Sequence, residues 1–185
     1  RSSIRSFVLE YRDKKFVKIA DLPWCLRVIN RVDGPILLGQ QFGTDSVFNT
    51  PIYEIVWNNG KYQEGKRMKI PLGLSIYGLT IDDLITGTSE KVIALDEYDH
   101  LVVFEQTEKP LLKILTFGGS PEFLYKSEES FGGCNTSFEL SDHDIGPDRQ
   151  KMTARINLRI LTYDLNKDGK KEIIIVKNLS AVGRV

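Results

Sequence analysis

The chain has 185 residues, of which 41% are hydrophobic, and this is enough for one domain with its own core. Its 25 basic and 25 acidic residues balance, so long-range attraction to nucleic acid or to an acidic membrane is not expected. No apolar run in the sequence approaches the roughly 20 residues that a membrane-spanning helix needs, so no membrane-spanning segment is expected.

Short apolar stretches separated by polar turns recur along the chain, and this pattern predicts an all-β architecture. The first predicted hairpin joins residues 7–11 to residues 16–20. The second follows residues 52–57 and turns at Asn58-Asn59-Gly60, where the Asn-Gly pair favours the positive φ angles of a tight turn. Residues 91–105 are predicted to form a third hairpin around a polar tip.

Two further stretches have simple interpretations. Residues 81–84 are the only ones that suggest a turn or two of helix, and they are equally consistent with a loop. The basic stretch from Gly65 to Lys69 is interpreted as a solvated strand edge, whose lysines discourage edge-to-edge aggregation.

The sequence also repeats internally. Residues 172–185 align without a gap beneath residues 91–104, and the same alignment places Asp164 on Asp83. A looser third copy begins at Gly34. The lengths of these repeated units are typical of four-stranded propeller blades, so we predict an incomplete β-propeller of about three blades. The approximate units are 1–50, 51–105 and 106–185, with an inserted polar loop at 127–148.

The cysteines and histidines offer little for catalysis. Neither Cys25 nor Cys134 has a partner at metal-ligand spacing, and we expect two unpaired, buried thiols, with one long-range disulfide as the alternative. With only His100 and His143, a histidine-based zinc site or catalytic triad has little material.

The stretch "DLNKDGKKE" from Asp164 to Glu172 presents side-chain oxygens at alternate positions of a short loop. Gly169 permits a sharp turn that lets the next carbonyl, that of Lys170, face inward, and calcium prefers six to eight such oxygens. An EF-hand is rejected because Ile175 stands where the bidentate glutamate belongs. A calcium loop that leads directly into a strand remains, and a solvated polar turn without metal is the alternative.

The pattern D-x-N-x-D-G-x-x-E-I-I-I-V resembles the FG-GAP/VCBS repeats of β-propeller proteins, a class that includes the integrin α-subunit head and many bacterial surface and periplasmic proteins. In that family the loop binds calcium between the first two strands of a blade. In the second unit Ile85, Gly87 and Lys91 replace the oxygen ligands, so one site is expected. The resemblance implies one structural Ca²⁺ held by Asp164, Asn166, Asp168, the carbonyl of Lys170 and Glu172.

Two other groups of residues have competing interpretations. The cluster "DEYDH" at residues 96–100 has the composition of acid/base machinery, but turn geometry at a polar hairpin tip explains it by itself and is favoured. Five aromatic side chains are assigned to packing between blades, with a sugar-stacking platform as the alternative: Trp24, Trp57, Tyr62, Tyr77 and Phe104.

The function expected from the resemblance is that of a non-catalytic, calcium-stabilised propeller module that binds a protein or glycan at the cell surface or in the periplasm. The alternatives are a hydrolase or polysaccharide lyase on a propeller scaffold, and a structural segment of a larger surface assembly. Because three blades do not close a ring comfortably, we expect a homo-oligomer or contact with neighbouring blades of a longer chain. An extracytoplasmic location follows from the resemblance, and millimolar calcium there would fill such a loop.

Overall fold

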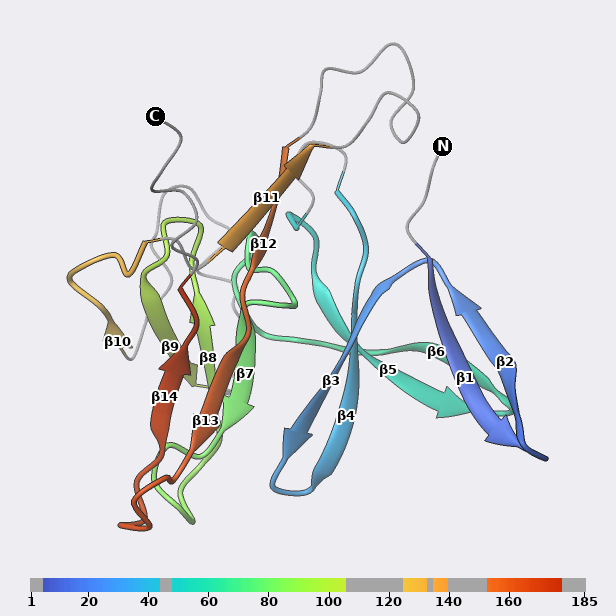
Figure 1. The fold of residues 1–185 in the computed structure, drawn as a ribbon, viewed down its shortest axis with the longest axis horizontal. Coiled ribbons are helices and arrows are strands. Elements are labelled where there is room, and N and C mark those ends of the chain that lie inside the picture. Colours follow the sequence, from blue (N-terminus) through green and yellow to red (C-terminus); the bar gives the residue numbers. More distant parts are fainter. Residues whose placement is uncertain (1–4, 44–47, 106–124, 133–134, 140–152, 178–185) are drawn as a thin grey trace.

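The computed structural model describes residues 5–43, 48–105, 125–132, 135–139 and 153–177. Within these ranges the regular structure consists only of strands, so the predicted all-β class is confirmed (Figure 1). The strands are β1 (Ser6–Arg12), β2 (Lys15–Leu22), β3 (Cys25–Arg31), β4 (Gly34–Gln40), β5 (Ile52–Asn58), β6 (Lys61–Arg67), β7 (Leu79–Asp82), β8 (Lys91–Leu95), β9 (Leu101–Glu105), β10 (Tyr125–Lys126), β11 (Asn135–Glu139), β12 (Thr153–Asn157), β13 (Ile160–Tyr163) and β14 (Glu172–Ile175).

The three predicted hairpins are present. β1 and β2 are joined by Asp13 and Lys14, whose φ angles of 48° and 63° are those of a tight turn. β5 and β6 turn at Asn59 and Gly60, with φ of 49° and 78°, as the Asn-Gly signal predicts. β8 and β9 form the third hairpin.

The suggested helical turn at residues 81–84 is wrong, whereas the loop alternative is correct for Asp83 and Leu84, which follow the strand. Leu79–Asp82 is instead strand β7, in which the alternating burial of Leu79 and Ile81 shows the two-residue period of a strand. The basic stretch lies on or beside β6, which is an edge strand of its sheet, and Lys66 and Arg67 are exposed as expected.

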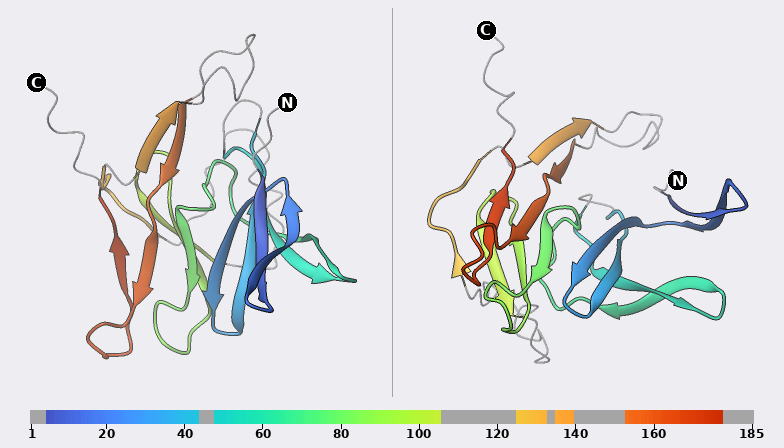
Figure 2. Two further views of the ribbon diagram at one scale, coloured as in Figure 1. Left: turned by 45° about the vertical axis from the view of Figure 1, so that its right-hand side comes forward. Right: turned by 60° about the horizontal axis from the view of Figure 1, so that its bottom comes forward.

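The strands form a succession of antiparallel sheets. β3-β4-β5-β6 is a four-stranded meander, and so is β7-β8-β9-β10; we call these the first and second sheets. β13 and β14 form a two-stranded third sheet. β7 contacts both β3 and β13, so the first strands of the three sheets lie side by side, and Figures 1 and 2 show the sheets following one another. The arrangement is not closed into a barrel and is compatible with part of a propeller.

Two hydrophobic cores hold the three sheets together. The larger one includes Leu38 of the first sheet with Val92 and Phe104 of the second. The smaller one joins Ile93 of the second sheet to Ile160 of the third. β8 therefore contributes alternate side chains to both cores, which explains why its sequence is an almost continuous apolar run.

The internal repeat is present in the backbone. Leu79 pairs with Ala94 in the second sheet, and Ile160 pairs with Ile175 in the third, so strands, loop and register recur at a spacing of 81 residues. The first sheet relates differently to the predicted units, because the boundary between residues 50 and 51 lies between β4 and β5, which are hydrogen-bonded to each other. The predicted insertion contains β11, which pairs with β12.

Candidate calcium loop

The predicted metal loop connects β13 to β14 at one end of the third sheet. Lys167 and Gly169 have φ angles of 63° and 85°, so the chain passes twice through the left-handed region and curls tightly. Glycine accommodates this conformation without strain, which is the role predicted for Gly169.

Backbone N–H groups draw the first oxygens of the loop together. The N–H of Asp168 donates to Asp164 Oδ1 at 3.1 Å and to Asn166 Oδ1 at 3.0 Å. The second carboxylate oxygen of Asp164 accepts the N–H of Gly169 at 2.9 Å. Two of the predicted ligands therefore share one donor and lie side by side.

The remaining side chains complete the ring of bonds. Asp168 Oδ1 accepts the N–H of Lys170 at 2.8 Å, and its other oxygen accepts Asn166 Nδ2 at 3.2 Å. Glu172 Oε2 accepts the N–H of Leu165 at 2.8 Å. The loop thus brings Asp164, Asn166 and Asp168 together, while Glu172 is held against the start of the loop.

The arrangement has a chemical consequence for any cation. In the described part of the chain, no group of three or more histidine, cysteine, aspartate or glutamate side chains is arranged to hold a metal ion. To bind a calcium ion at this loop, the carboxylates of Asp164 and Asp168 would exchange their backbone N–H donors for the ion. The Asn166 oxygen, backbone carbonyls and water would supply further ligands.

The equivalent loop of the second sheet keeps the leading aspartate but lacks most of the other side-chain oxygens. Asp83, at the position of Asp164, is buried and accepts the N–H of Gly87 at 2.8 Å. Lys91, at the position of Glu172, is bonded to Ser89 and, at 3.1 Å, to Glu105. The leading aspartate of each loop is therefore a turn-forming residue in its own right.

The two loops are also fastened to each other. The N–H of Thr86 donates to the carbonyl of Gly169, and that of Lys171 to the carbonyl of Leu84, both at 2.9 Å. The Lys171 ammonium bonds the carboxylates of Asp82 and Asp83. The Lys171 hydrogen bond lowers the pKa of Asp83, against the opposing effect of burial. Burial lowers the pKa of Lys171, but the two carboxylates outweigh it and the net shift is upward.

An ion pair also joins the first and second sheets, but here the residue before the second strand is acidic and its partner is basic. Glu90 accepts two hydrogen bonds from the Arg31 guanidinium and one from the N–H of Val32, the last at 2.9 Å. Glu90 and Lys171 occupy the same place in the repeat, immediately before the second strand of their sheets. Sequence reasoning missed both residues, although their equivalent positions were visible in the alignment.

The cluster at residues 96–100 is a turn rather than an acid/base pair. Asp96 Oδ1 accepts the N–H groups of Tyr98 and His100, each at 2.9 Å, and Lys126 bonds its other oxygen at 2.7 Å. Burial raises the pKa of Asp96, but these partners outweigh it and the net shift is downward. A general acid would need the opposite shift.

The predictions for the cysteines and the aromatic side chains are confirmed in part. Cys25 is free and buried, as expected, whereas Cys134 and His143 lie outside the described residues. Phe104 packs in the core between the first two sheets, and Tyr77 packs against that core, so both fit the packing assignment. Trp57 does not, because it is 55% exposed and its ring meets that of Tyr62, in the same hairpin, edge to face.

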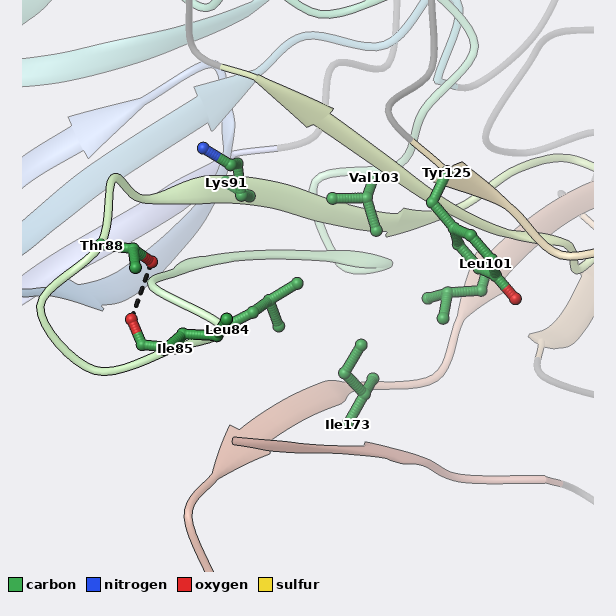
Figure 3. A pocket seen from close by; sticks show the side chains of 8 residues that line it. All are labelled: Leu84, Ile85, Thr88, Lys91, Leu101, Val103, Tyr125 and Ile173. Atoms are coloured by element: carbon green, nitrogen blue, oxygen red, sulfur yellow. Dashed lines mark hydrogen bonds between the residues drawn. The ribbon is translucent and has the colours of Figure 1, made fainter. Parts of the chain in front are cut away.

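A hollow lies between the second and third sheets (Figure 3). This apolar groove has a volume of about 370 Å³, and Lys91 is its one charged lining residue. Figure 3 shows Leu84 from the loop, Leu101 from β9 and Ile173 from β14 around the same space. The apolar groove is lined by Leu84, Ile85, Thr88, Lys91, Leu101, Val103, Tyr125 and Ile173.

No helix in the described ranges is long and apolar enough to cross a membrane. The chain matches no protein-family model, no curated protein and no solved structure.

Proposed function

We propose that the chain is a non-catalytic β-propeller module of the FG-GAP/VCBS type, stabilised by one calcium ion and displayed outside the cytoplasm, where it binds a protein or glycan partner. The ion is assigned to the loop between β13 and β14. Its role is to fix that loop, and the binding surface is assigned to loops at the sheet ends.

One observation carries the proposal: the loop between β13 and β14 repeats the loop between β7 and β8 in length and strand register, yet three of its alternate positions carry side-chain oxygens that the other loop lacks. Asn166, Asp168 and Glu172 stand at the positions of Ile85, Gly87 and Lys91. In the second-sheet loop the leading aspartate, Asp83, accepts the N–H of Gly87, and the turn forms without a side-chain oxygen at the positions of Asn166 and Asp168. Asn166 and Asp168 are therefore additional to what the turn requires. Added oxygens at this spacing suit a hard cation.

Calcium would act on stability rather than on chemistry. The loop draws together Asp164 and Asp168, whose negative charges repel each other, and a divalent ion replaces that repulsion by attraction. Binding to the folded chain alone adds about 2.7 kcal/mol of stability when calcium is at about 100 times its dissociation constant. For a chain of this size that corresponds to a rise of about 5 to 10 °C in the unfolding midpoint.

The test is thermal unfolding of the wild-type chain in excess EDTA and then in millimolar calcium. We expect calcium to raise the wild-type midpoint by several degrees and to leave Asp168→Ala unchanged. Asp33→Ala is the matched control, because Asp33 is an exposed acidic turn residue outside the loop, and it should keep the full gain. A wild-type midpoint that does not respond to calcium would refute the metal assignment and leave the loop as a polar turn.

A further inference from the structure

Arg27 is a half-buried arginine on β3, on the same face as Cys25 and Ile29, which belong to the core between the first two sheets. Its Nη1 atom donates to the carbonyls of Ile76 and Tyr77 at 2.8 and 2.5 Å. These carbonyls lie in the segment that leads into β7, the first strand of the second sheet. One nitrogen of the guanidinium is therefore held in a fixed place beside the start of β7.

Arg27 differs from the other half-buried cations at the sheet junctions, because it has no carboxylate partner in the described part of the chain. Arg31 bonds Glu90, and Lys171 bonds two aspartates. Among the described residues, Arg27 bonds only the two carbonyls, which carry no net charge. Burying a charge without a counter-ion costs free energy, so an anion that reached Arg27 would be bound favourably.

The opposite edge of the Arg27 guanidinium is open. Its Nε and Nη2 atoms make no hydrogen bond to any described residue. Because no buried side-chain nitrogen of the described residues lacks a partner, both atoms are in contact with solvent. An arginine presents two such parallel N–H groups when it binds an oxyanion bidentately. The bonds of Nη1 therefore hold in place an edge suited to an oxyanion.

A second arginine adds its charge at the same place. Arg159 immediately precedes β13, and β13 and β3 both contact β7 (Figure 1). Burial and the nearby charge of Arg159 lower the pKa of Arg27 to about 10, which leaves Arg27 charged at neutral pH. Arg159 is exposed and makes no hydrogen bond or ion pair with a described residue. Its side chain can therefore turn toward an ion held by Arg27.

We propose that Arg27 and Arg159 together bind a phosphate group. Nε and Nη2 of Arg27 would each donate to one phosphate oxygen, and Arg159 would donate to a third. A carboxylate has two oxygens, and the Arg27 edge would occupy both. A phosphate group also carries about 1.5 to 2 negative charges at neutral pH, which match the two guanidinium charges that otherwise repel each other.

The phosphate site is separate from the calcium loop and goes beyond the proposed function. Arg27 lies near the start of β3 and Arg159 just before β13, whereas the calcium loop follows the end of β13. Phosphate binding can therefore be measured in excess EDTA. Its test and the calcium test can fail separately.

The test is titration of the full chain with inorganic phosphate and, separately, with glucose 6-phosphate, in excess EDTA and at an ionic strength held constant with chloride. The readouts are the unfolding midpoint and the NMR signal of the Arg27 Nε–H group, assigned by its loss in Arg27→Lys. We expect both ligands to raise the midpoint and to shift this signal in a saturable way. Tighter binding of glucose 6-phosphate would identify a phosphate ester as the ligand, and tighter binding of inorganic phosphate would identify the free ion.

Three variants locate the site. Arg159→Gln should weaken phosphate binding about tenfold or more, because a charged hydrogen bond is lost while the bonds of Arg27 to the carbonyls stay intact. Arg27→Lys keeps a cation beside the carbonyls but loses the two-donor edge, so its midpoint should no longer respond although its circular dichroism is that of the wild type. Arg67→Gln is the matched control, because Arg67 is an exposed arginine on β6, and it should bind phosphate as the wild type does.

Several results would overturn the proposal. A wild-type chain whose midpoint and Arg27 signal do not respond to millimolar phosphate has no such site. An affinity that is unchanged in Arg159→Gln removes the second arginine from it, and an affinity that falls equally in Arg67→Gln shows only general attraction by surface charge. Acetate that shifts the Arg27 signal at concentrations as low as phosphate does would point to a carboxylate ligand instead.

Discussion

Replacing Gln40 by leucine should be among the most destabilising single changes in the chain. Gln40 is fully buried at the end of β4, and its amide nitrogen donates to the carbonyls of Phe48, Thr50 and Leu74 at 2.9 to 3.2 Å. Its amide oxygen accepts the N–H of Ile76 at 2.9 Å. One side chain thus joins the first sheet to two irregular segments that carry buried backbone groups.

Leucine has a similar size but makes none of these bonds. The N–H of Ile76 would stay buried without an acceptor, which costs about 1 to 3 kcal/mol. The three carbonyls would lose a donor at a smaller cost each, so we expect a total loss of about 3 kcal/mol. At roughly 2 to 4 °C per kcal/mol for a chain of this size, the midpoint should fall by about 6 to 12 °C.

Urea and thermal unfolding of Gln40→Leu beside Gln41→Leu measure the effect. Gln41 is the next residue and is exposed, so its replacement should leave the free energy of unfolding nearly unchanged. If Gln40→Leu unfolds within about 2 °C of the wild type, the buried bonds contribute little and the reasoning is refuted.

Three further outcomes are expected. Gly39→Ala should lose about 1 to 3 kcal/mol in urea unfolding, because its Cβ would lie 2.7 Å from Cγ1 of Ile55; an unchanged midpoint would show that Ile55 moves aside freely. Lys171→Met should lower the free energy of unfolding at neutral pH. Since the pKa of Asp83 is lowered in the folded state, the difference in this free energy from the wild type should shrink as pH falls below about 4. A difference that stays constant with pH contradicts the ion pair. Burial raises the pKa of Tyr77 to about 12, so its contribution to stability should be lost as pH rises from about 10 toward that value, and the midpoint of Tyr77→Phe should depend less steeply on pH there than that of the wild type.

The strands were predictable because their signals are local. The Asn59-Gly60 turn and the apolar run of β8 each follow from a few neighbouring residues. The 81-residue repeat was visible as coinciding apolar positions, and the backbone register of β13 and β14 confirms it. Strand β7 at Leu79–Asp82 was the exception, because a strand of four residues is too short for its period to stand out from that of a helical turn.

Contacts between elements could not be predicted in the same way. Gln40 is, in the sequence, a polar residue at a strand end, and only the fold shows that four backbone groups, three of them in buried hydrogen bonds, converge on it. Lys171 lies in a lysine-rich loop and resembles a solvated charge until Asp82 and Asp83 are brought beside it. The alternating oxygens from Asp164 onward predicted a metal-binding loop. They did not predict that the Asp164 carboxylate would accept backbone N–H groups of the same loop.

The reversed charges at the two junctions give the sheets a fixed order. Glu90 matches Arg31 of the first sheet, whereas Lys171 matches the acidic pair of the second. If the third sheet packed on the first, Lys171 would meet Arg31, and like charges would be held together at a partly buried site. Repeated units with similar apolar faces could otherwise pack in several sequences. The charges at each junction therefore select one neighbouring sheet and disfavour the other. A repeated unit can keep its fold and still occupy only one position in the order of sheets.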